Sequence, residues 1–323
     1  MKRKLMVGMQ VLLAAALAFA AAHAGAQTWP TRPIRMIIPF PPGGVSDVLG
    51  RFWAAKLANA LGQPIVAENR PGAGTTIAAD VVAKAPADGY TIYFTDVTSH
   101  AINATLYKKL PYDSVDDFTT VALVAASPLL FVVPASVPVN SLKDFVDLAK
   151  QKQMNYASSG NGTILHLSGE SLKSMAGIEL THVPYKGSGP AVLATLAGET
   201  SATFSTMPPA LPHVKSGRMK ALGVTSPMRN PAVPDVPTMK ELLPAFEVML
   251  YSGILGPAGL PQQVVERLNG EVSKGLQSAD TNKLYADMGA DPVQMSPQQF
   301  KRHLQAEIEK LGKAVRASGA RVD

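Results

Sequence analysis

The sequence predicts an α/β protein made of two similar units, each a mainly parallel sheet with flanking helices. Runs rich in β-branched residues alternate with amphipathic helical runs along most of the chain. A strand, a glycine-rich loop and a helix start follow one another twice, at Phe40–Asp47 and at Ala157–Ile164. Of the 323 residues, 46% are hydrophobic and 17% are charged, which supports full cores and excludes a disordered or coiled-coil chain.

The N-terminus has the pattern of an export signal. A basic stretch, Lys2–Lys4, precedes an unbroken apolar run, Val11–Ala22, and Ala24-Gly25-Ala26 fits the small-residue rule for cleavage. The apolar run is short for a membrane span, which disfavours the alternative of an uncleaved anchor. We therefore expect residues 1–26 to be removed and the mature chain to start at Gln27 in the periplasm.

The composition excludes several function classes. The chain has no cysteine, so disulfides, thiolate metal sites, a cysteine nucleophile and a lipid-anchored lipoprotein are ruled out. Removal of the leader takes away three basic and no acidic residues, which lowers the formal net charge from +6 to +3. A charge of this size spread over the mature chain does not form a nucleic-acid-binding surface.

The first strand, turn and helix form a candidate anion site. Ile34–Phe40 is an apolar run that Pro41–Gly44 brings to an end. Ser46 is expected to cap the following helix, which should stop at Gly62 and carry Asp47 in its first turn. Free backbone N–H groups at such a helix start bind anions without a charged side chain. The alternative is a tight βα turn with no ligand.

The rest of the first unit follows the same alternation. Strands are expected at Ile65–Glu68 and Tyr90–Thr95, with a helix at Thr75–Ala85 between them. Right-handed crossovers in this β-α-β-α-β order place the helix starts at the carboxyl edge of a parallel sheet. Thr98 and Ser99 come just after the third strand and are expected on a loop at that edge.

The chain is expected to cross between the units at two places. Strand-like runs at Thr119–Ala125 and Leu129–Val133 are separated by Ser127-Pro128, where the first crossing is placed. Val248–Leu255 is apolar enough to form the return. The predicted division is residues 1–26 as signal peptide, 27–126 plus 248–323 as the first domain, and 127–247 as the second.

The second unit and the closing helices are assigned from periodicity and turn residues. Ser141 begins a helix with a capping-box-like pattern, and Pro190 is expected at the first position of another helix. Strands are expected at Asn155–Ala157, Leu180–Tyr185, Ala202–Ser205 and Ala221–Thr225, and further helices at Ile164–Met175, Ala210–Ser216, Pro261–Leu276, Thr281–Met288 and Pro297–Ala317.

Recognisable catalytic patterns are missing from the sequence. It contains no Gly-x-Ser-x-Gly nucleophile elbow, no HExxH zinc motif and no phosphate-binding P-loop. Gly72-Ala73-Gly74 and Gly187-Ser188-Gly189 lack the third glycine of a dinucleotide fingerprint. The histidines show no metal-ligand spacing, so we expect neither a metal nor another cofactor.

What remains is a group of small polar residues on loops at the two predicted sheet edges. Hydroxyls, an amide and backbone N–H groups suit the oriented binding of a carboxylate. No base stands next to a serine in a recognisable pattern, so an activated nucleophile is not expected. For the second loop the alternative is a plain capped turn. The group comprises Ser46, Thr98, Ser99, Ser158, Ser159, Asn161 and Thr163, with Gly43, Gly44, Gly160 and Gly162.

A series of motifs runs in order through the mature chain. It consists of PFPPGG with SDVLGR, NRPGAG, ADVVAKAPADGYT, YASSGNGT, VPYKGSGPA, LPHVKSGRMKALGVTS and PDVPT. These motifs resemble the Bug family of periplasmic solute-binding proteins, which belong to the tripartite tricarboxylate transporter type. The resemblance implies a two-domain, type-II periplasmic-binding-protein fold that closes on a small organic carboxylate or amino acid in the cleft between its domains.

The resemblance also implies which residues bind the ligand. The family's two carboxylate-holding loops match Pro41–Asp47 and Ser158–Thr163 here. Many relatives carry Asp or Asn where this chain has Ser205, so we expect a ligand without a free ammonium group. Asp47 should be engaged by its helix start, which leaves Asp96 as the other candidate acid. The predicted set is Phe40, Pro42, Gly43, Gly44, Val45, Ser46, Asp47, Thr98, Ser99, Ser158, Ser159, Asn161, Gly162, Thr163, Tyr185 and Ser205.

The expected function is that of a non-catalytic binding protein, which captures a small carboxylate in the periplasm and delivers it to membrane permease subunits. The expected protein is a monomer with no cofactor, no metal and no nucleic-acid partner. One alternative is a sensor that presents its closed form to a receptor kinase. A more distant alternative is an exported α/β hydrolase or dehydrogenase, and the missing motifs weigh against it.

Overall fold

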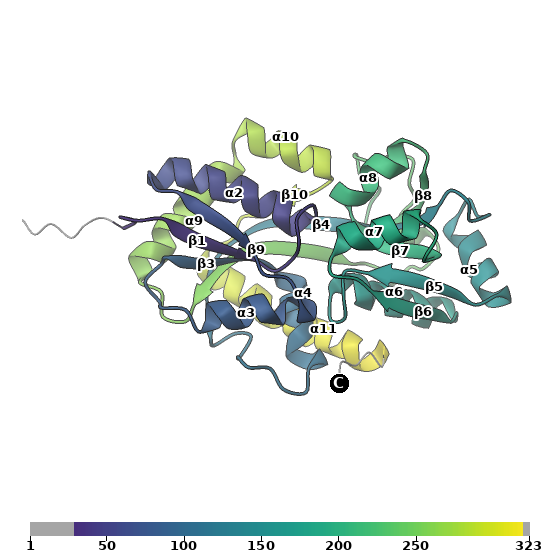
Figure 1. Ribbon diagram of the computed structural model, residues 1–323, viewed down its shortest axis with the longest axis horizontal. Coiled ribbons are helices and arrows are strands. Elements are labelled where there is room, and N and C mark those ends of the chain that lie inside the picture. Colours follow the sequence, from purple (N-terminus) through teal and green to yellow (C-terminus); the bar gives the residue numbers. More distant parts are fainter. Residues whose placement is uncertain (1–28, 319–323) are drawn as a thin grey trace, which may run out of the picture.

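The protein is a mixed α/β molecule, and the computed structural model describes residues 29–318. The expected signal peptide, residues 1–26, lies outside the described residues. Within them, strands form one sheet in the order β2-β1-β3-β9-β4-β7-β5-β6, and β8 and β10 also pair with β4. Figure 1 shows helices covering both faces of this sheet.

The bounds of the elements follow the predicted alternation of strands and helices. The strands are β1 (Ile34–Ile38), β2 (Ile65–Asn69), β3 (Thr91–Asp96), β4 (Phe118–Pro134), β5 (Met154–Ser158), β6 (Leu180–Pro184), β7 (Ala202–Thr206), β8 (Met219–Val224), β9 (Met249–Pro257) and β10 (Asp291–Pro292). The helices are α2 (Val45–Leu61), α3 (Thr76–Ala83), α4 (Val97–Leu106), α5 (Leu142–Gln151), α6 (Ile164–Ala176), α7 (Ser188–Leu196), α8 (Met207–Lys215), α9 (Gln262–Leu276), α10 (Ala279–Met288) and α11 (Pro297–Ser318), with 3₁₀ turns η1 (Ala73–Thr75) and η2 (Met239–Glu241).

Two parallel groups of strands lie on either side of β4 and β9. β1 pairs in parallel with β2 and β3, and β5 pairs in parallel with β6 and β7. β9 is antiparallel to β3 and to the first part of β4, while the second part of β4 is antiparallel to β7 and β8. The predicted parallel sheets are therefore confirmed. The part of the molecule built on β1, β2 and β3 is called the first half and the part built on β5, β6 and β7 the second half, and β4 runs through both (Figure 1).

The predicted break at Ser127-Pro128 is wrong, because β4 continues through it. Pro128 still pairs with Met249 of β9, and pairing with β7 begins at the next residue, Leu129. A proline is tolerated where the strand changes partner, since its missing N–H interrupts neither ladder. The Leu129 N–H donates instead to the Thr225 hydroxyl at 2.8 Å. The domain boundaries at 126/127 and 247/248 stay a prediction.

One helix start also differs from its prediction. Helix α7 begins at Ser188 rather than at Pro190, and Gly187 precedes it with a φ of 135° that favours glycine. Pro190 is therefore the third helical residue. It fits there because N–H groups in the first turn have no partner within the helix.

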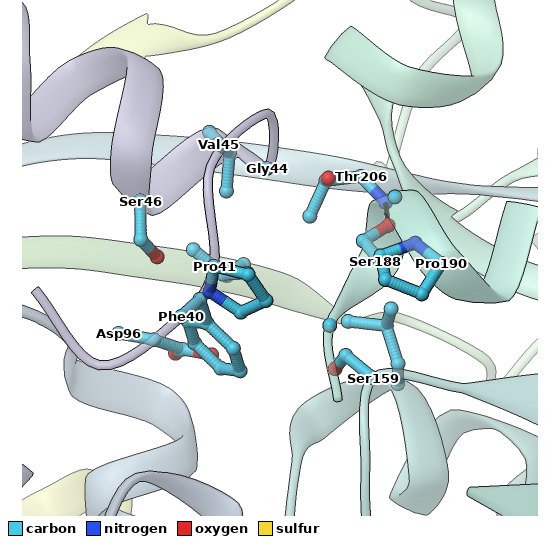
Figure 2. A pocket seen from close by; sticks show the side chains of 14 residues that line it. Phe40, Pro41, Gly44, Val45, Ser46, Asp96, Ser159, Ser188, Pro190 and Thr206 are labelled. Carbon is cyan, nitrogen blue, oxygen red and sulfur yellow. Dashed lines mark hydrogen bonds between the residues drawn. The ribbon is translucent and has the colours of Figure 1, made fainter. Parts of the chain in front are cut away.

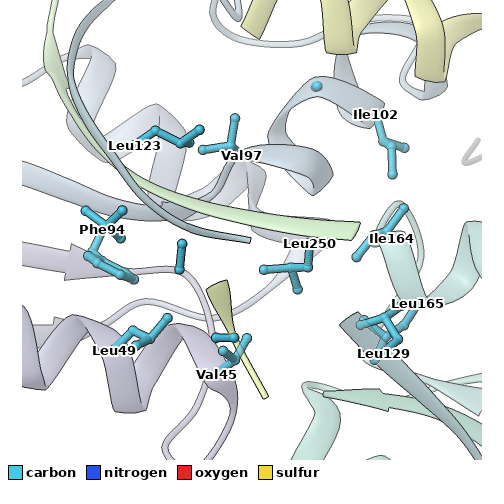
Figure 3. Close-up of a cluster of buried hydrophobic side chains, with 14 of the residues drawn as sticks. Val45, Leu49, Phe94, Val97, Ile102, Leu123, Leu129, Ile164, Leu165 and Leu250 are labelled. Carbon is cyan, nitrogen blue, oxygen red and sulfur yellow. The ribbon is translucent and has the colours of Figure 1, made fainter. Parts of the chain in front are cut away.

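Apolar side chains from both halves join in one continuous core (Figure 3). Val45 and Phe94 come from the first half, Leu129 and Ile164 from the second, and Leu250 of β9 lies between them. All five are almost completely buried. This shared core holds the glycine loops of both halves at fixed positions beside one another.

No helix between residues 29 and 318 combines the length and the apolar character that a membrane crossing requires.

Two glycines within helices test how tightly the core is packed. A Cβ on Gly169 of α6 would overlap the Tyr156 ring, whereas a Cβ on Gly270 of α9 would meet nothing within 4 Å. We expect Gly169→Ala to lower the free energy of unfolding by about 1–3 kcal/mol through overpacking. Gly270→Ala is the control and should raise it by up to about 1 kcal/mol through helix propensity. Urea unfolding measures both, and equal effects would contradict this account of the packing.

Candidate functional site

A pocket lies where the loops of the two halves meet (Figure 2). The first half supplies the turn between β1 and α2, the end of β3 and the start of β9. The second half supplies the turns after β5 and β6 and the end of β7. The lining residues are Phe40, Pro41, Gly44, Val45, Ser46, Asp96 and Leu250 on one side, and Ser159, Leu165, Gly187, Ser188, Gly189, Pro190 and Thr206 on the other.

The turn before α2 presents the start of that helix to the pocket. Gly43 has a φ of 97°, which suits glycine, and the helix begins at Val45 with Gly44 as its N-cap. Ser46 is therefore not the N-cap that the sequence predicted, because the helix starts two residues earlier than expected. A glycine N-cap has no side chain to accept the first N–H groups, so these remain available to a ligand.

Asp47 is fully engaged, as predicted, and shapes the turn from behind. Its carboxylate accepts hydrogen bonds from the Gly43 N–H at 3.1 Å, from Arg51 Nε at 2.9 Å and from Asn69 Nδ2 at 2.9 Å. Asn69 Nδ2 also donates to the Phe40 carbonyl at 2.7 Å. Asp47 is buried but does not line the pocket. Its contacts hold Gly43 in the conformation that exposes the helix start.

The end of β3 carries a buried acid in the pocket wall. Asp96 is completely buried and is the N-cap of α4, accepting the Ser99 N–H at 2.9 Å and the Ser99 hydroxyl. Burial raises the pKa of Asp96 to about 6, although the bonds from Ser99 act in the opposite direction. Ser99 Oγ also accepts the N–H of Ile164, the first residue of α6, at 3.1 Å. One hydroxyl thus connects the two halves.

Thr98 and Ser99 lie in the first turn of α4, not on a loop as predicted. The capping bond from Asp96 stabilises this helix start, and the sequence reading did not use that signal. Thr98 Oγ1 donates to the Met249 carbonyl at 3.3 Å and accepts the Tyr251 N–H at 2.8 Å. Both hydroxyls therefore support the pocket from behind, and neither residue lines it.

The second loop divides its hydroxyls between structure and the pocket. Thr163 is the N-cap of α6, and its hydroxyl donates to the Gly160 carbonyl at 2.8 Å. Ser158 Oγ lies 2.6 Å from His182 Nε2 and accepts the Gly160 N–H at 3.1 Å. Only Ser159 lines the pocket, and its hydroxyl has no partner among the described residues.

The Ser158–His182 contact joins a serine to a base, which the sequence did not reveal. Ser158 is completely buried and lies outside the pocket lining. Burial, with the nearby His166, lowers the pKa of His182 to about 3, so the imidazole is a neutral partner. The pair holds the loop, and its burial separates it from the space where a substrate would lie.

The remaining predicted residues occupy four different places. Asn161 and Tyr185 line a neighbouring cavity, which shares Phe40 and Ser159 with the pocket. A Cβ on Gly162 would lie 2.7 Å from Asn103 Oδ1, so this glycine allows the loop to pack on α4. Ser205 is buried and donates to the Thr206 carbonyl at 2.8 Å. Pro42 and Gly43 form the turn without lining the pocket.

Sequence reasoning missed the segment Gly187–Pro190, along with Leu165, Thr206 and Leu250, as pocket residues. A sequence signal for Gly187–Pro190 was available. Gly187-Ser188-Gly189 follows a strand and precedes a helix, as do the glycine loops before α2 and α6. A Cβ on Gly187 would lie 2.9 Å from Pro41 Cγ, so this loop closes directly over the first one. For the apolar Leu165 and Leu250 no sequence signal distinguishes a pocket position from the core.

The structure offers no metal chemistry in its described part. Within residues 29–318, no three His, Cys, Asp or Glu side chains gather closely enough to hold a metal ion. His100 is completely buried and its Nε2 lies 2.9 Å from the Ser114 carbonyl oxygen. What the pocket provides is helix starts, neutral hydroxyls and one buried carboxylate.

Sequence comparison finds relatives along almost the whole chain. Residues 49–320 match the model of the tripartite tricarboxylate transporter family receptor. The chain is 36% identical over 306 residues to protein BugT of Bordetella pertussis, with 94% of each chain covered. It is also 36% identical over 313 residues to a Pseudomonas protein from the tcbD-tcbE intergenic region, covering 95% of this chain and 93% of that protein.

Three solved structures are similar over nearly their entire lengths. An R. palustris protein with adipate has a TM-score of 0.88 and 37% identity, covering 91% of this chain and 100% of that one. Periplasmic binding protein BugD has a TM-score of 0.87 and 29% identity, covering 91% of this chain and 99% of that one. MatC from Rhodopseudomonas palustris with bound malate has a TM-score of 0.83 and 33% identity, covering 89% of this chain and 100% of that one. The two-domain periplasmic-binding-protein fold is thus confirmed.

The buried Asp96 predicts a pH-dependent stability. Its pKa is about 6 in the folded protein against an ordinary 3.8, so between these values the folded protein binds more protons than the unfolded chain. The contribution of Asp96 to stability therefore falls as the pH rises through this window. Asp96→Asn removes this titration, so the loss of stability between pH 4 and pH 7.5 should be smaller in the variant than in the wild type by roughly 2 kcal/mol.

Urea unfolding of wild type and Asp96→Asn at both pH values measures this difference. Asp47→Asn is the control, because it weakens the contact with Arg51 but leaves Asp96 and its pH dependence in place. An Asp96→Asn protein that loses as much stability as the wild type between pH 4 and pH 7.5 would contradict the account.

Proposed function

The chain belongs to the tripartite tricarboxylate transporter receptor family and is a periplasmic binding protein of the Bug type, and we propose that it captures a small organic carboxylate in the pocket between its halves. The observation that carries the proposal is the start of α2, where Gly44, Val45 and Ser46 line the pocket. The first N–H groups of a helix have no partner within it and form the positive end of its dipole. Such a start binds a carboxylate.

The proposed binding uses neutral donors in place of a cationic side chain. None of the described residues lining the pocket is Lys or Arg. The unpartnered Ser159 hydroxyl supplies a donor from the second half, opposite α2 (Figure 2). Hydrogen bonds to a charged group are stronger than those between neutral groups, so a few such donors suffice to orient a carboxylate.

The ligand is proposed to carry no free ammonium group. An ammonium group taken out of water needs a carboxylate partner or several acceptors. Asp96 is the one acid in the pocket lining, and both of its oxygens already bind Ser99. The neighbours solved with adipate and with malate are in line with a plain or hydroxylated carboxylate.

The wider role is proposed to be transport. After cleavage of a leader ending at Ala26, the monomeric protein would carry its ligand to the permease subunits of a tripartite tricarboxylate transporter without chemical change. The family model supports the transporter partner, and the buried, neutral Ser158–His182 pair supports a binding role over catalysis. Loss of carboxylate uptake in a deletion strain, with intact ligand-induced gene expression, would distinguish transport from sensing.

A ligand that binds only the folded state raises the melting temperature. We expect plain or hydroxylated carboxylates to do so for the wild type, and amino acids of matched length to have little effect. Gly44→Val should remove the shift by blocking the α2 start and weaken binding at least about tenfold. Its own stability should stay close to wild type, because Gly44 has a φ of −84° and its added Cβ meets nothing within 4 Å. Normal binding by Gly44→Val would exclude this turn as the site.

The neighbouring serines of the second loop give a matched pair for calorimetry. Ser159→Ala should weaken carboxylate binding by about 1–3 kcal/mol and leave the unfolding free energy nearly unchanged, because its hydroxyl has no partner in the described part of the chain. Ser158→Ala should instead lower the unfolding free energy by about 1 kcal/mol, since it leaves His182 and Gly160 without their contact. The reverse pattern would place the ligand on the other face of the loop.

A further inference from the structure

Thr206 carries a buried hydroxyl that faces the pocket and has no hydrogen-bond partner among residues 29–318. The residue lines the pocket at the end of β7 and is 4% exposed. Its Oγ1 is buried without a hydrogen bond to any described residue. Figure 2 shows the Thr206 side chain turned toward Val45 across the pocket. Buried hydroxyls are normally satisfied, so an unpaired one in a pocket wall points to a ligand.

The sequence after Thr206 explains why this hydroxyl is free. Thr206 is the N-cap of α8, and an N-cap threonine usually accepts the N–H of the second or third helical residue. Here those residues are Pro208 and Pro209, which have no N–H. Both donors that would otherwise hold the hydroxyl against the helix are missing.

The backbone of Thr206 is held firmly while its hydroxyl is not. The Thr206 N–H donates to Ser188 Oγ at 3.1 Å, and its carbonyl accepts the Ser205 hydroxyl at 2.8 Å. Ser188 Oγ and Ser205 Oγ are themselves 3.0 Å apart. These bonds fix the direction of the side chain in advance, and a preorganised donor loses little entropy on binding.

Other neutral donors lie on the same side of the pocket. Gly187, Ser188 and Gly189 line it at the start of α7, and Ser159 adds a second unpartnered hydroxyl. These donors lie opposite the α2 start. Asp96, the one carboxylate among the described residues that line the pocket, lies on the α2 side. The pocket therefore has donors for oxygen at two ends.

Building on the proposed carboxylate function, we infer that Thr206 determines specificity by binding a second carboxylate of the ligand, and that Pro208 and Pro209 keep its hydroxyl available. The α2 start then holds one end of a dicarboxylate. Thr206, Ser159 and the first N–H groups of α7 hold the other. A monocarboxylate of the same length would leave these donors unpaired, and unpaired buried donors weaken binding.

The test uses isothermal calorimetry with the series from succinate to suberate and the monocarboxylates of matched length. For the dicarboxylate that binds tightest, Thr206→Val should weaken binding about 10- to 100-fold, and the matched monocarboxylate should change less than about threefold. Thr206→Ser keeps the hydroxyl and should stay close to wild type. Full dicarboxylate affinity in Thr206→Val, or equal losses in the Val and Ser variants, would overturn the inference.

A variant outside the pocket lining tests the role of the prolines. Pro209→Ala restores an N–H at the third helical position and should draw the Thr206 hydroxyl onto the helix. We expect weaker dicarboxylate binding, unchanged monocarboxylate binding and a melting temperature no lower than that of wild type. Unchanged dicarboxylate affinity would overturn the role of the prolines. A wild type that binds no carboxylate would contradict the proposed function, and the inference with it.

Discussion

The hydroxyl of Ser99 joins the two halves of the protein beside the pocket, and much of the site depends on this one group. It donates to the buried Asp96 carboxylate and accepts the Ile164 N–H at 3.1 Å. Without this hydroxyl, the Asp96 carboxylate would keep the bond from the Ser99 N–H but lose the second one, and the Ile164 N–H would lose its partner, which is costly for buried polar groups. Since β3, α4 and α6 all meet at this hydroxyl, it fixes the second loop relative to the first and places Ser159 opposite the α2 start.

The sequence allowed most of the fold to be predicted, because local rules and tertiary structure agree along most of the chain. Gly62 ends α2 in the left-handed conformation, and Ser141 caps α5 by accepting the Asp144 N–H. The errors fall where tertiary pairing overrides a local signal. Ser127-Pro128 reads as a break, yet partners on both sides keep β4 extended through it. Local propensity carries no information about such partners.

The site was predicted less well, because neighbouring residues of one loop point in opposite directions. Ser158 and Ser159 are alike in sequence, yet one binds His182 and the other faces the pocket. Ser205 and Thr206 repeat this at the end of β7, where the first is bonded within the protein and the second is free. Side chains alternate between faces in extended backbone, so an uncertainty of one residue reverses the assignment. Motif spacing cannot resolve a single residue in this way.

A site built from neutral donors also bears on how a carrier releases its cargo. The α2 start lies in one half, whereas Ser159, Thr206 and the α7 start lie in the other. Helix dipoles and hydroxyls act strongly only where water is excluded, because a high dielectric weakens every such interaction. Separation of the halves would admit water and remove half of the donors in one step. An arginine would keep its full charge after opening. A pocket whose donors are neutral therefore binds an anion well only while the two halves together exclude water, which suits the proposed capture and delivery.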